Sequence, residues 1–233
     1  MTGRLYGVGV GPGAPDLVTL RAARLIEGAA VICYPTLAGA PSFARGIVAG
    51  LIPGGAEEIV IDLPMRTERA PAQAAYDAGA VRIAERLSAG VDVVCLCEGD
   101  PFLYGSFMYL HARLAGRFAV EVVPGVSSVT AAAAAAGRPL VARNEVFAIV
   151  PAPLPEAEIA ARLAGASSVA LMKLGRHMAK VRAVIEAAGL TGRAVYVERA
   201  TLGAEVVLPL AEAPEVAPYF SMILVTKEAD PWL

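Results

Sequence analysis

Short apolar runs alternate with segments of helical periodicity over the first 137 residues, and this alternation constrains the fold more strongly than any other feature. Five apolar runs are predicted as strands, at residues 5–10, 30–35, 58–64, 91–97 and 117–123. Helices are predicted at residues 17–26, 42–51, 73–87 and 107–114, and a fifth helix is predicted to end at Ala136. Asp16 and Ser42 are the expected N-caps of the first two. Strands that alternate with helices form a mainly parallel sheet covered on both faces, so residues 1–137 are predicted to form an α/β domain.

The pattern changes after a joint at about residues 137–144. Five strand candidates follow, at residues 146–150, 168–174, 194–198, 205–208 and 220–225, with helices near 155–163 and 178–188. Because the later strands follow one another without helices between them, residues 145–233 are predicted to form a second α/β domain with a mixed sheet.

Composition limits the classes of function. Hydrophobic residues make up 56% of the chain and charged residues 18%, which indicates a compact globular protein. The net charge of −2 argues against a general nucleic-acid-binding protein, and no apolar run reaches the roughly 18 residues of a membrane span. The three cysteines form no CxxC pair, and the N-terminus shows no signal pattern. Both observations favour a location in the reducing cytoplasm. The two histidines, His111 and His177, lack metal-ligand spacing, so no metal is expected.

An acidic, glycine-bearing turn at residues 97–106 follows the predicted strand 91–97 and precedes the predicted helix 107–114. The carboxyl ends of strands in open α/β sheets are where such proteins bind ligands. Glu98 and Asp100 are therefore candidates to meet a cation or ribose hydroxyls. The alternative is an ordinary loop in which Asp100 forms the turn.

A second glycine-rich turn, at residues 7–13, also follows a predicted strand. It is not a dinucleotide-binding fingerprint, because no helix starts directly after it and no acidic residue ends the next predicted strand. It is not a P-loop either, because it lacks Gly-Lys-Ser/Thr. The turn therefore suits either a small ligand or tight packing. Further along, Ser127 lacks the closing glycine of a nucleophile elbow, whereas Ser127 and Ser128 can donate to a ligand at a helix start.

Four motifs, at residues 9–13, 98–105, 123–128 and 196–200, resemble in order and spacing those of the tetrapyrrole methylase family, over nearly the whole chain. Residues 97–114, 171–177 and 218–222 resemble the branch that methylates C20 of precorrin-2 in cobalamin biosynthesis. The resemblance implies two α/β domains, a homodimer, and S-adenosylmethionine bound in the cleft between the domains. It also implies a tetrapyrrole substrate. Related branches that act on the cobalt-containing precursor or on uroporphyrinogen, and a tetrapyrrole-binding carrier, remain alternatives.

The resemblance also implies which residues bind the cofactor. Those that match the family's motifs are Pro12, Glu98, Gly99, Asp100, Leu103, Ser127, Ser128, Met172, Leu174 and Ala200. Many relatives have Thr-Ala in place of Ser127-Ser128, and Gly-Gly-Asp in place of Glu98-Gly99-Asp100. Glu98 therefore adds a carboxylate where the family has a glycine.

Methyl transfer from a sulfonium to carbon needs alignment more than acid–base catalysis, and no side chain stands out as the base that removes the bridge proton. Water and Glu98 are the alternatives. The acceptor carries several carboxylates, which arginines bind as charge-assisted forks. The arginines expected on loops or element ends are Arg66, Arg69, Arg143 and Arg176.

Overall fold

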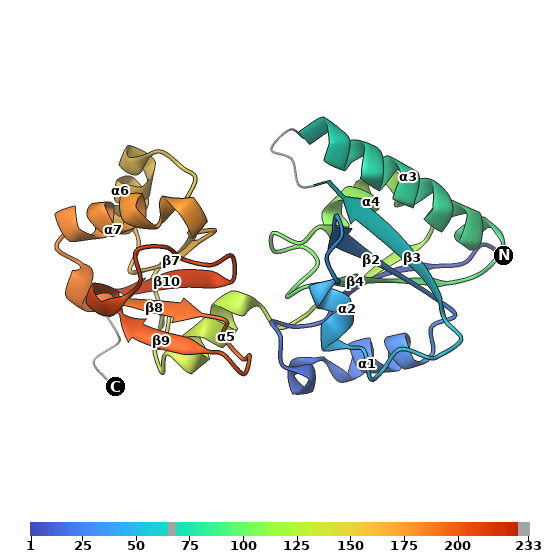
Figure 1. Ribbon diagram of the computed structural model, residues 1–233, viewed down its shortest axis with the longest axis horizontal. Helices are drawn as coiled ribbons and strands as arrows, with labels where there is room; N and C mark the ends of the chain where they lie inside the picture. The colour runs from blue at the N-terminus through green and yellow to red at the C-terminus, as the bar shows by residue number, and fades with distance from the viewer. Residues whose placement is uncertain (65–68, 228–233) are drawn as a thin grey trace. The chain divides into compact units, whose positions relative to one another are not determined.

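The computed structural model describes residues 1–64 and 69–227, and of Arg69 only the backbone (Figure 1). The chain divides into two compact units, Met1–Ser127 and Ser128–Leu233. The boundary between the units precedes helix α5 (Ser128–Ala135), whereas the sequence predicted a joint after that helix. Each unit is built around one five-stranded sheet.

The sheet of the first unit is parallel throughout, in the order β3-β2-β4-β1-β5. Its strands are β1 (Leu5–Gly9), β2 (Val31–Leu37), β3 (Glu57–Leu63), β4 (Val93–Cys97) and β5 (Val120–Val123). The helices are α1 (Leu20–Glu27), α2 (Phe43–Ile47), α3 (Arg69–Ser88) and α4 (Phe107–Leu114). The predicted parallel α/β arrangement is confirmed.

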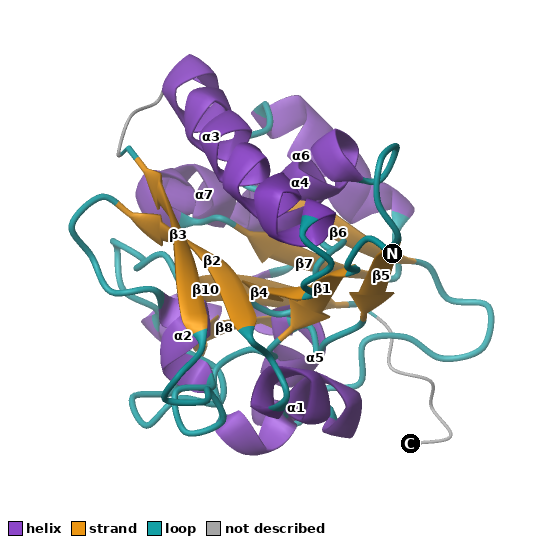
Figure 2. Cartoon of the chain, turned by 90° about the vertical axis from the view of Figure 1, so that its right-hand side faces the viewer, coloured by secondary structure: helices purple, strands orange, loops and turns teal. Residues whose placement is uncertain are grey.

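Successive side chains of each strand point to opposite faces of the sheet, and in the central strands β1 and β4 both sets are largely buried. Helices α3 and α4 pack on the face that carries Cys33, Cys95 and Cys97, and α1 and α2 pack on the other face (Figures 1 and 2). All three cysteines are free and buried. They fill the core on that face.

One of the two predicted N-caps is confirmed. The Ser42 hydroxyl accepts the N–H of Arg45 at 3.4 Å, although α2 ends at Ile47, several residues earlier than predicted. The prediction for Asp16 is wrong: a short 3-10 turn (Pro15–Leu17) contains it, and Thr19 caps α1 by accepting the N–H of Ala22. The extra turn arises because Pro15 favours the first position of a helical turn and so starts one before α1.

The second unit has a mixed sheet, as predicted, in the order β6-β7-β10-β8-β9. Strands β6 and β7 are parallel and the other pairs are antiparallel. The strands are β6 (Phe147–Pro151), β7 (Ser168–Met172), β8 (Ala194–Glu198), β9 (Val206–Pro209) and β10 (Ser221–Thr226). The other two helices of this unit are α6 (Glu156–Gly165) and α7 (Met178–Ala187).

Helices α6 and α7 cover one face of this sheet, where Tyr196 and Leu171 are fully buried. Helix α5 covers the other face, against Ala170 and Val197. Its alanines let it lie close to the sheet, which explains the alanine run at residues 131–136. None of the helices in the described part of the chain combines the length and apolar composition needed to cross a bilayer.

Candidate functional site

The first unit has a topological switch point between its neighbouring strands β1 and β4. From β1 the chain continues to α1 on one face of the sheet, and from β4 it continues to α4 on the opposite face. Open α/β sheets bind ligands where the connections diverge in this way, outside the carboxyl ends of the strands. Both glycine-bearing turns predicted from the sequence lie at this edge, since one follows β1 and the other follows β4.

Three glycines bring the loops after β1, β4 and β5 into backbone contact. A side-chain carbon added to Gly9 would lie 2.6 Å from the Gly99 carbonyl oxygen and 2.6 Å from the Gly125 nitrogen, well inside the roughly 3.5 Å of an ordinary contact. Gly99 has φ of +61° and donates its N–H to the Gly11 carbonyl at 2.8 Å. A side chain at Gly9 or Gly125 would push the loops apart, so these glycines fix a close-packed backbone edge.

The Asp100 carboxylate ties two of these loops together. One oxygen accepts the N–H of Phe102 at 2.9 Å, and the other accepts the N–H of Gly125 at 3.1 Å. The first bond closes a turn, which is the role that the alternative interpretation of the sequence assigned to Asp100. The second bond joins the loop after β4 to the loop after β5. Asp100 therefore shapes the edge, and its predicted contact with a cofactor stays a prediction.

Other predicted cofactor residues of the first unit lie at the same edge. Pro12 is partly buried beside Gly11, and Leu103 is 37% exposed in the turn after β4. Glu98 directly follows β4 with an exposed side chain, although desolvation by surrounding atoms raises the pKa of its carboxyl. Ser127 is partly buried at the end of the unit.

The second unit places strained turns after β7 and β8. Lys173, Arg199 and Thr201 all have positive φ, between 49° and 71°. Non-glycine residues in this region cost of order 1–3 kcal/mol each and cluster at functional sites. Met172 and Ala200, predicted to border the adenosine, are the immediate neighbours of these strained residues. Ser128 is partly buried at the first position of α5.

A hydrogen-bond network, part-buried at Tyr196 and exposed at Arg199, supports the turn after β8. The Tyr196 hydroxyl donates to Glu198 at 2.7 Å, and Glu198 pairs with Arg199. Burial raises the pKa of Tyr196, and the bond to Glu198 raises it further. The N–H of Thr201 donates to Glu205 at 2.6 Å. The Glu205 carboxylate therefore holds the strained backbone at Thr201, and Glu198 holds the side chain of Arg199.

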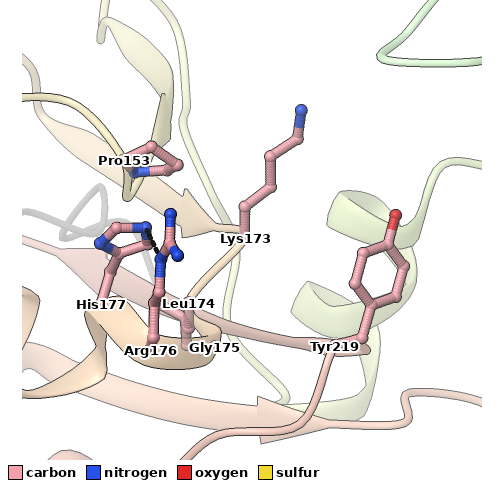
Figure 3. A pocket seen from close by; sticks show the side chains of 7 residues that line it. All are labelled: Pro153, Lys173, Leu174, Gly175, Arg176, His177 and Tyr219. Carbon is pink, nitrogen blue, oxygen red and sulfur yellow. Dashed lines mark hydrogen bonds between the residues drawn. The ribbon is translucent and has the colours of Figure 1, made fainter. Parts of the chain in front are cut away.

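The second unit also contains a pocket of about 340 Å³ next to the turn after β7 (Figure 3). We call it the basic pocket, and the residues that line it are Pro153, Lys173, Leu174, Gly175, Arg176, His177 and Tyr219. Arg176 and His177 lie side by side, with 3.5 Å between Nε of Arg176 and Nε2 of His177 (Figure 3). Partial burial lowers the pKa of His177, and the charges of Lys180 and Arg176 lower it further.

The basic pocket brings together Leu174 and Arg176, which the sequence assigned to the cofactor and to the substrate. It also contains Lys173, His177 and Tyr219, which the sequence analysis missed. The adjacent basic residues at 173, 176 and 177 were a usable signal for the first two, and the resemblance at residues 218–222 was one for Tyr219.

The other predicted arginines are not in this pocket. Arg143 is exposed in a turn with φ of +47°, and the side chain of Arg69, at the first position of α3, lies outside the described residues, as does the whole of Arg66. Within the described ranges, no three His, Cys, Asp or Glu side chains gather in a way that could hold a metal ion. The cofactor and substrate assignments stay predictions.

Comparison with known proteins adds relatives that cover the whole chain. A family model described as tetrapyrrole (corrin/porphyrin) methylases matches residues 4–214. The precorrin-2 C(20)-methyltransferase of Sinorhizobium sp is 41% identical over 96% of this chain and 95% of that protein. The cobalt-precorrin-2 C(20)-methyltransferase of Salmonella typhimurium is 34% identical over 98% of each chain. This chain spans 46%, about half, of the cobalamin biosynthesis protein CobIJ of Mycobacterium tuberculosis, with 44% identity over 96% of this chain.

A solved structure shares the fold. It is a uroporphyrin-III C-methyl transferase from Thermus thermophilus complexed with S-adenyl homocysteine. The TM-score is 0.68 at 26% sequence identity, over 97% of this chain and 92% of that chain.

Proposed function

Because the chain belongs to the tetrapyrrole (corrin/porphyrin) methylases, we propose that it transfers a methyl group from S-adenosylmethionine to C20 of precorrin-2, giving precorrin-3A in cobalamin biosynthesis. The family was predicted from the four sequence motifs, and that prediction is confirmed. The chain is accordingly a methyltransferase. The observation that carries the proposal is the 41% identity, over 96% of the chain, to a precorrin-2 C(20)-methyltransferase.

The edge of the first sheet fits the methyl donor. The contact between Gly9, Gly99 and Gly125 leaves a surface of backbone groups, which can approach a ligand more closely than side chains can. Bound S-adenosylmethionine supplies a methyl group on a positively charged sulfur. Since that charge disappears in the transition state, a strongly anionic wall would stabilise the ground state and slow transfer. The two N–H donors on Asp100 offset its negative charge, which suits a position near the sulfonium.

The chain's task is to hold the donor and the acceptor in line, since an in-line displacement gains most from orientation. We propose that the donor contacts all ten residues predicted for it, from Pro12 to Ala200 in sequence order. The bridge proton at C20 must leave after transfer. Glu98 lies at the same edge and is a candidate to accept it, with water as the alternative.

The acceptor requires positive charge because it carries several carboxylates. Arg66, Arg69, Arg143 and Arg176 remain the arginines proposed to anchor it. We also propose that the protein acts in the cytoplasm as a homodimer. The family resemblance implies two domains in each chain, and the pattern of strands and helices predicts them at residues 1–137 and 145–233.

Methyl transfer with assignment of the product tests the proposal. The purified protein is incubated with precorrin-2 and a donor labelled with carbon-13 at the methyl group, and the product is examined by NMR. We expect one labelled methyl group, at C20. Label at another carbon would contradict the proposed position, and binding of both substrates without transfer would indicate a carrier.

A second candidate function is methylation of the cobalt-containing acceptor. It is favoured by the 34% identity, over 98% of each chain, to the Salmonella typhimurium protein. A side-by-side assay with metal-free and cobalt-loaded precorrin-2 separates the two. We expect a higher kcat/KM for the metal-free acceptor, and the reverse order would favour the second function.

A further inference from the structure

The turn after β4 keeps an aromatic ring in contact with water. Phe102 is 50% exposed, and its N–H donates to the Asp100 carboxylate at 2.9 Å, which holds its backbone at the edge of the sheet. Between Asp100 and Arg113 the chain carries no Asp, Glu, Lys or Arg. The exposed ring therefore belongs to an uncharged stretch of the chain.

Two rings of α4 hold the ring of Phe102. His111 meets it edge to face, with 5.2 Å between the ring centroids and an interplanar angle of 89°, and Phe107 lies at 6.2 Å. Aromatic pairs favour such arrangements at these distances. Phe107 in turn packs directly on β1, since a side-chain carbon added to Gly7 would lie 2.2 Å from its ring. The ring of Phe102 is therefore positioned by contacts that reach down to the central sheet.

Met108 adds to the exposed apolar surface on this side of α4. It is 37% exposed and lies three residues before His111, so the two share one side of the helix. Tyr109 belongs to the side that faces α3, because its ring packs on Tyr76 with 5.0 Å between the centroids. We call Phe102, Met108 and His111 the apolar surface. Exposed apolar residues that gather in this way mark an interaction site.

We propose that the apolar surface contacts the flat ring system of the tetrapyrrole acceptor, with Phe102 touching the macrocycle and His111 as the positioning residue that holds its ring. The proposal rests on the proposed function. Asp100 and Leu103, which we propose to contact the donor, lie on either side of Phe102 in the sequence. Methyl transfer brings the reacting atoms within roughly 3–3.5 Å of each other, so the acceptor must approach this same turn. An uncharged surface suits the macrocycle itself and not its carboxylate arms.

Two other occupants fit the observations less well. The adenine of the donor is also flat, but the residues proposed to border the adenosine, Met172, Leu174 and Ala200, are all in the second unit, whereas Phe102 is in the first. A second copy of the chain would need roughly 800 Å² on each partner for a stable interface, and three partly exposed side chains offer only a small part of that area.

Removing the ring of Phe102 tests the proposal by steady-state kinetics. Phe102→Leu stays apolar but loses the ring, so we expect the KM for precorrin-2 to rise about three- to tenfold, with kcat changed less than twofold. Phe102→Tyr keeps the ring and should restore the wild-type KM to within twofold. Affinity for S-adenosylhomocysteine, measured by calorimetry, should stay unchanged. Tyr109→Leu is the matched control, because it removes a ring that is 42% exposed on the other side of α4, and it should leave the KM unchanged.

A double-mutant cycle tests the role of His111. His111→Ala should raise the KM for precorrin-2 about two- to fivefold, and His111→Phe, which keeps a ring, should not. If His111 acts by holding Phe102, the variant that combines His111→Ala with Phe102→Leu should have the KM of Phe102→Leu alone. Effects that multiply would show that His111 acts independently and would overturn its positioning role.

The outcomes separate this proposal from the proposed function. If precorrin-2 is methylated but Phe102→Leu leaves its KM unchanged, the proposed contact is wrong and the proposed function stands. If Phe102→Leu weakens S-adenosylhomocysteine binding, or lowers the mass of the protein in sedimentation, the ring contacts the donor or a second copy and the proposal is overturned. If the wild-type protein transfers no methyl group, the proposed function fails. Calorimetry with precorrin-2 and S-adenosylhomocysteine then decides for the ring, since wild type should bind the tetrapyrrole more tightly than Phe102→Leu, and equal affinities would overturn the contact.

Discussion

Replacing Asp100 by asparagine tests whether one carboxylate holds two loops of the first unit together. Asparagine keeps the size of the side chain but offers one accepting oxygen and an NH₂ group in place of two accepting oxygens. One of the N–H groups of Phe102 and Gly125 would therefore face another donor. The variant Asp100→Asn probes this bond without creating a cavity.

The expected loss follows from the two hydrogen bonds. A hydrogen bond to a charged acceptor contributes about 1.5–3 kcal/mol, and a donor left unsatisfied in a partly buried place costs a similar amount. Asp100 is partly buried, so we expect the free energy of unfolding to fall by about 2 kcal/mol. For a protein of this size that corresponds to a decrease in Tm of roughly 4–8 °C.

Urea denaturation followed by circular dichroism measures the change, with calorimetry of S-adenosylmethionine binding alongside. Asp16→Asn is the control, since Asp16 is exposed and its side chain caps no helix. An Asp100→Asn protein as stable as wild type would refute the argument that the carboxylate ties the loops. Asp100→Ala should in addition weaken donor binding while the fold persists, and unchanged affinity would remove Asp100 from the donor site.

Three further predictions concern other parts of the structure. Gly9→Ala should destabilise the protein by about 1–3 kcal/mol, because its methyl group would overlap two backbone atoms; an unchanged urea midpoint would contradict this. Tyr196→Phe should lower stability by about 1–2 kcal/mol, through loss of the bond to Glu198, whereas equal urea midpoints would show that this bond contributes nothing. The hydrogen bond from Arg45 lowers the pKa of Glu58 to about 2, below the value of 4.5 in the unfolded chain. The Glu58–Arg45 pair therefore stabilises the fold fully above pH 4.5, and this stabilisation is lost as the pH falls towards 2. Since the pair is partly exposed, we expect it to contribute about 1 kcal/mol to the free energy of unfolding. The difference in that free energy between wild type and Glu58→Gln should therefore shrink from about pH 5 to about pH 2.5.

Much of the fold could be predicted because local sequence carries it. The apolar runs alternate with helical segments in the first unit and follow one another in the second, which determines a parallel and a mixed sheet. The boundaries of α4 were predicted to the residue, since Ser106 and Gly105 end the preceding turn and apolar periodicity marks the helix. Asp16 misled the prediction because a good capping residue cannot reveal that Pro15 starts a separate turn first.

The candidate site was harder to predict because its contacts span long stretches of chain. The motifs marked Gly9, Gly99 and Gly125 individually, but only the fold reveals that the three backbones touch. The bond from Gly125 to Asp100 crosses 25 residues of sequence. The basic pocket likewise closes only when the segment with Tyr219 reaches the turn after β7. Composition and periodicity carry no information about such distances.

Both units place left-handed residues in the turns that follow their strands. In the first unit, Gly11 and Gly99 take this conformation at little cost, whereas Tyr104, with φ of +56°, takes it in the turn after β4 without being glycine. In the second unit, Lys173 and Arg199 occupy left-handed positions after β7 and β8. Glycine at these positions would avoid a backbone strain of about 1 kcal/mol or more per residue. Strained non-glycine residues cluster at functional sites, so the side chains kept at these positions are candidates for a functional role. Charge is not what they share, since Thr201, also left-handed after β8, is neutral. Lys173 lines the basic pocket, so the turn after β7 is where strain and a pocket coincide.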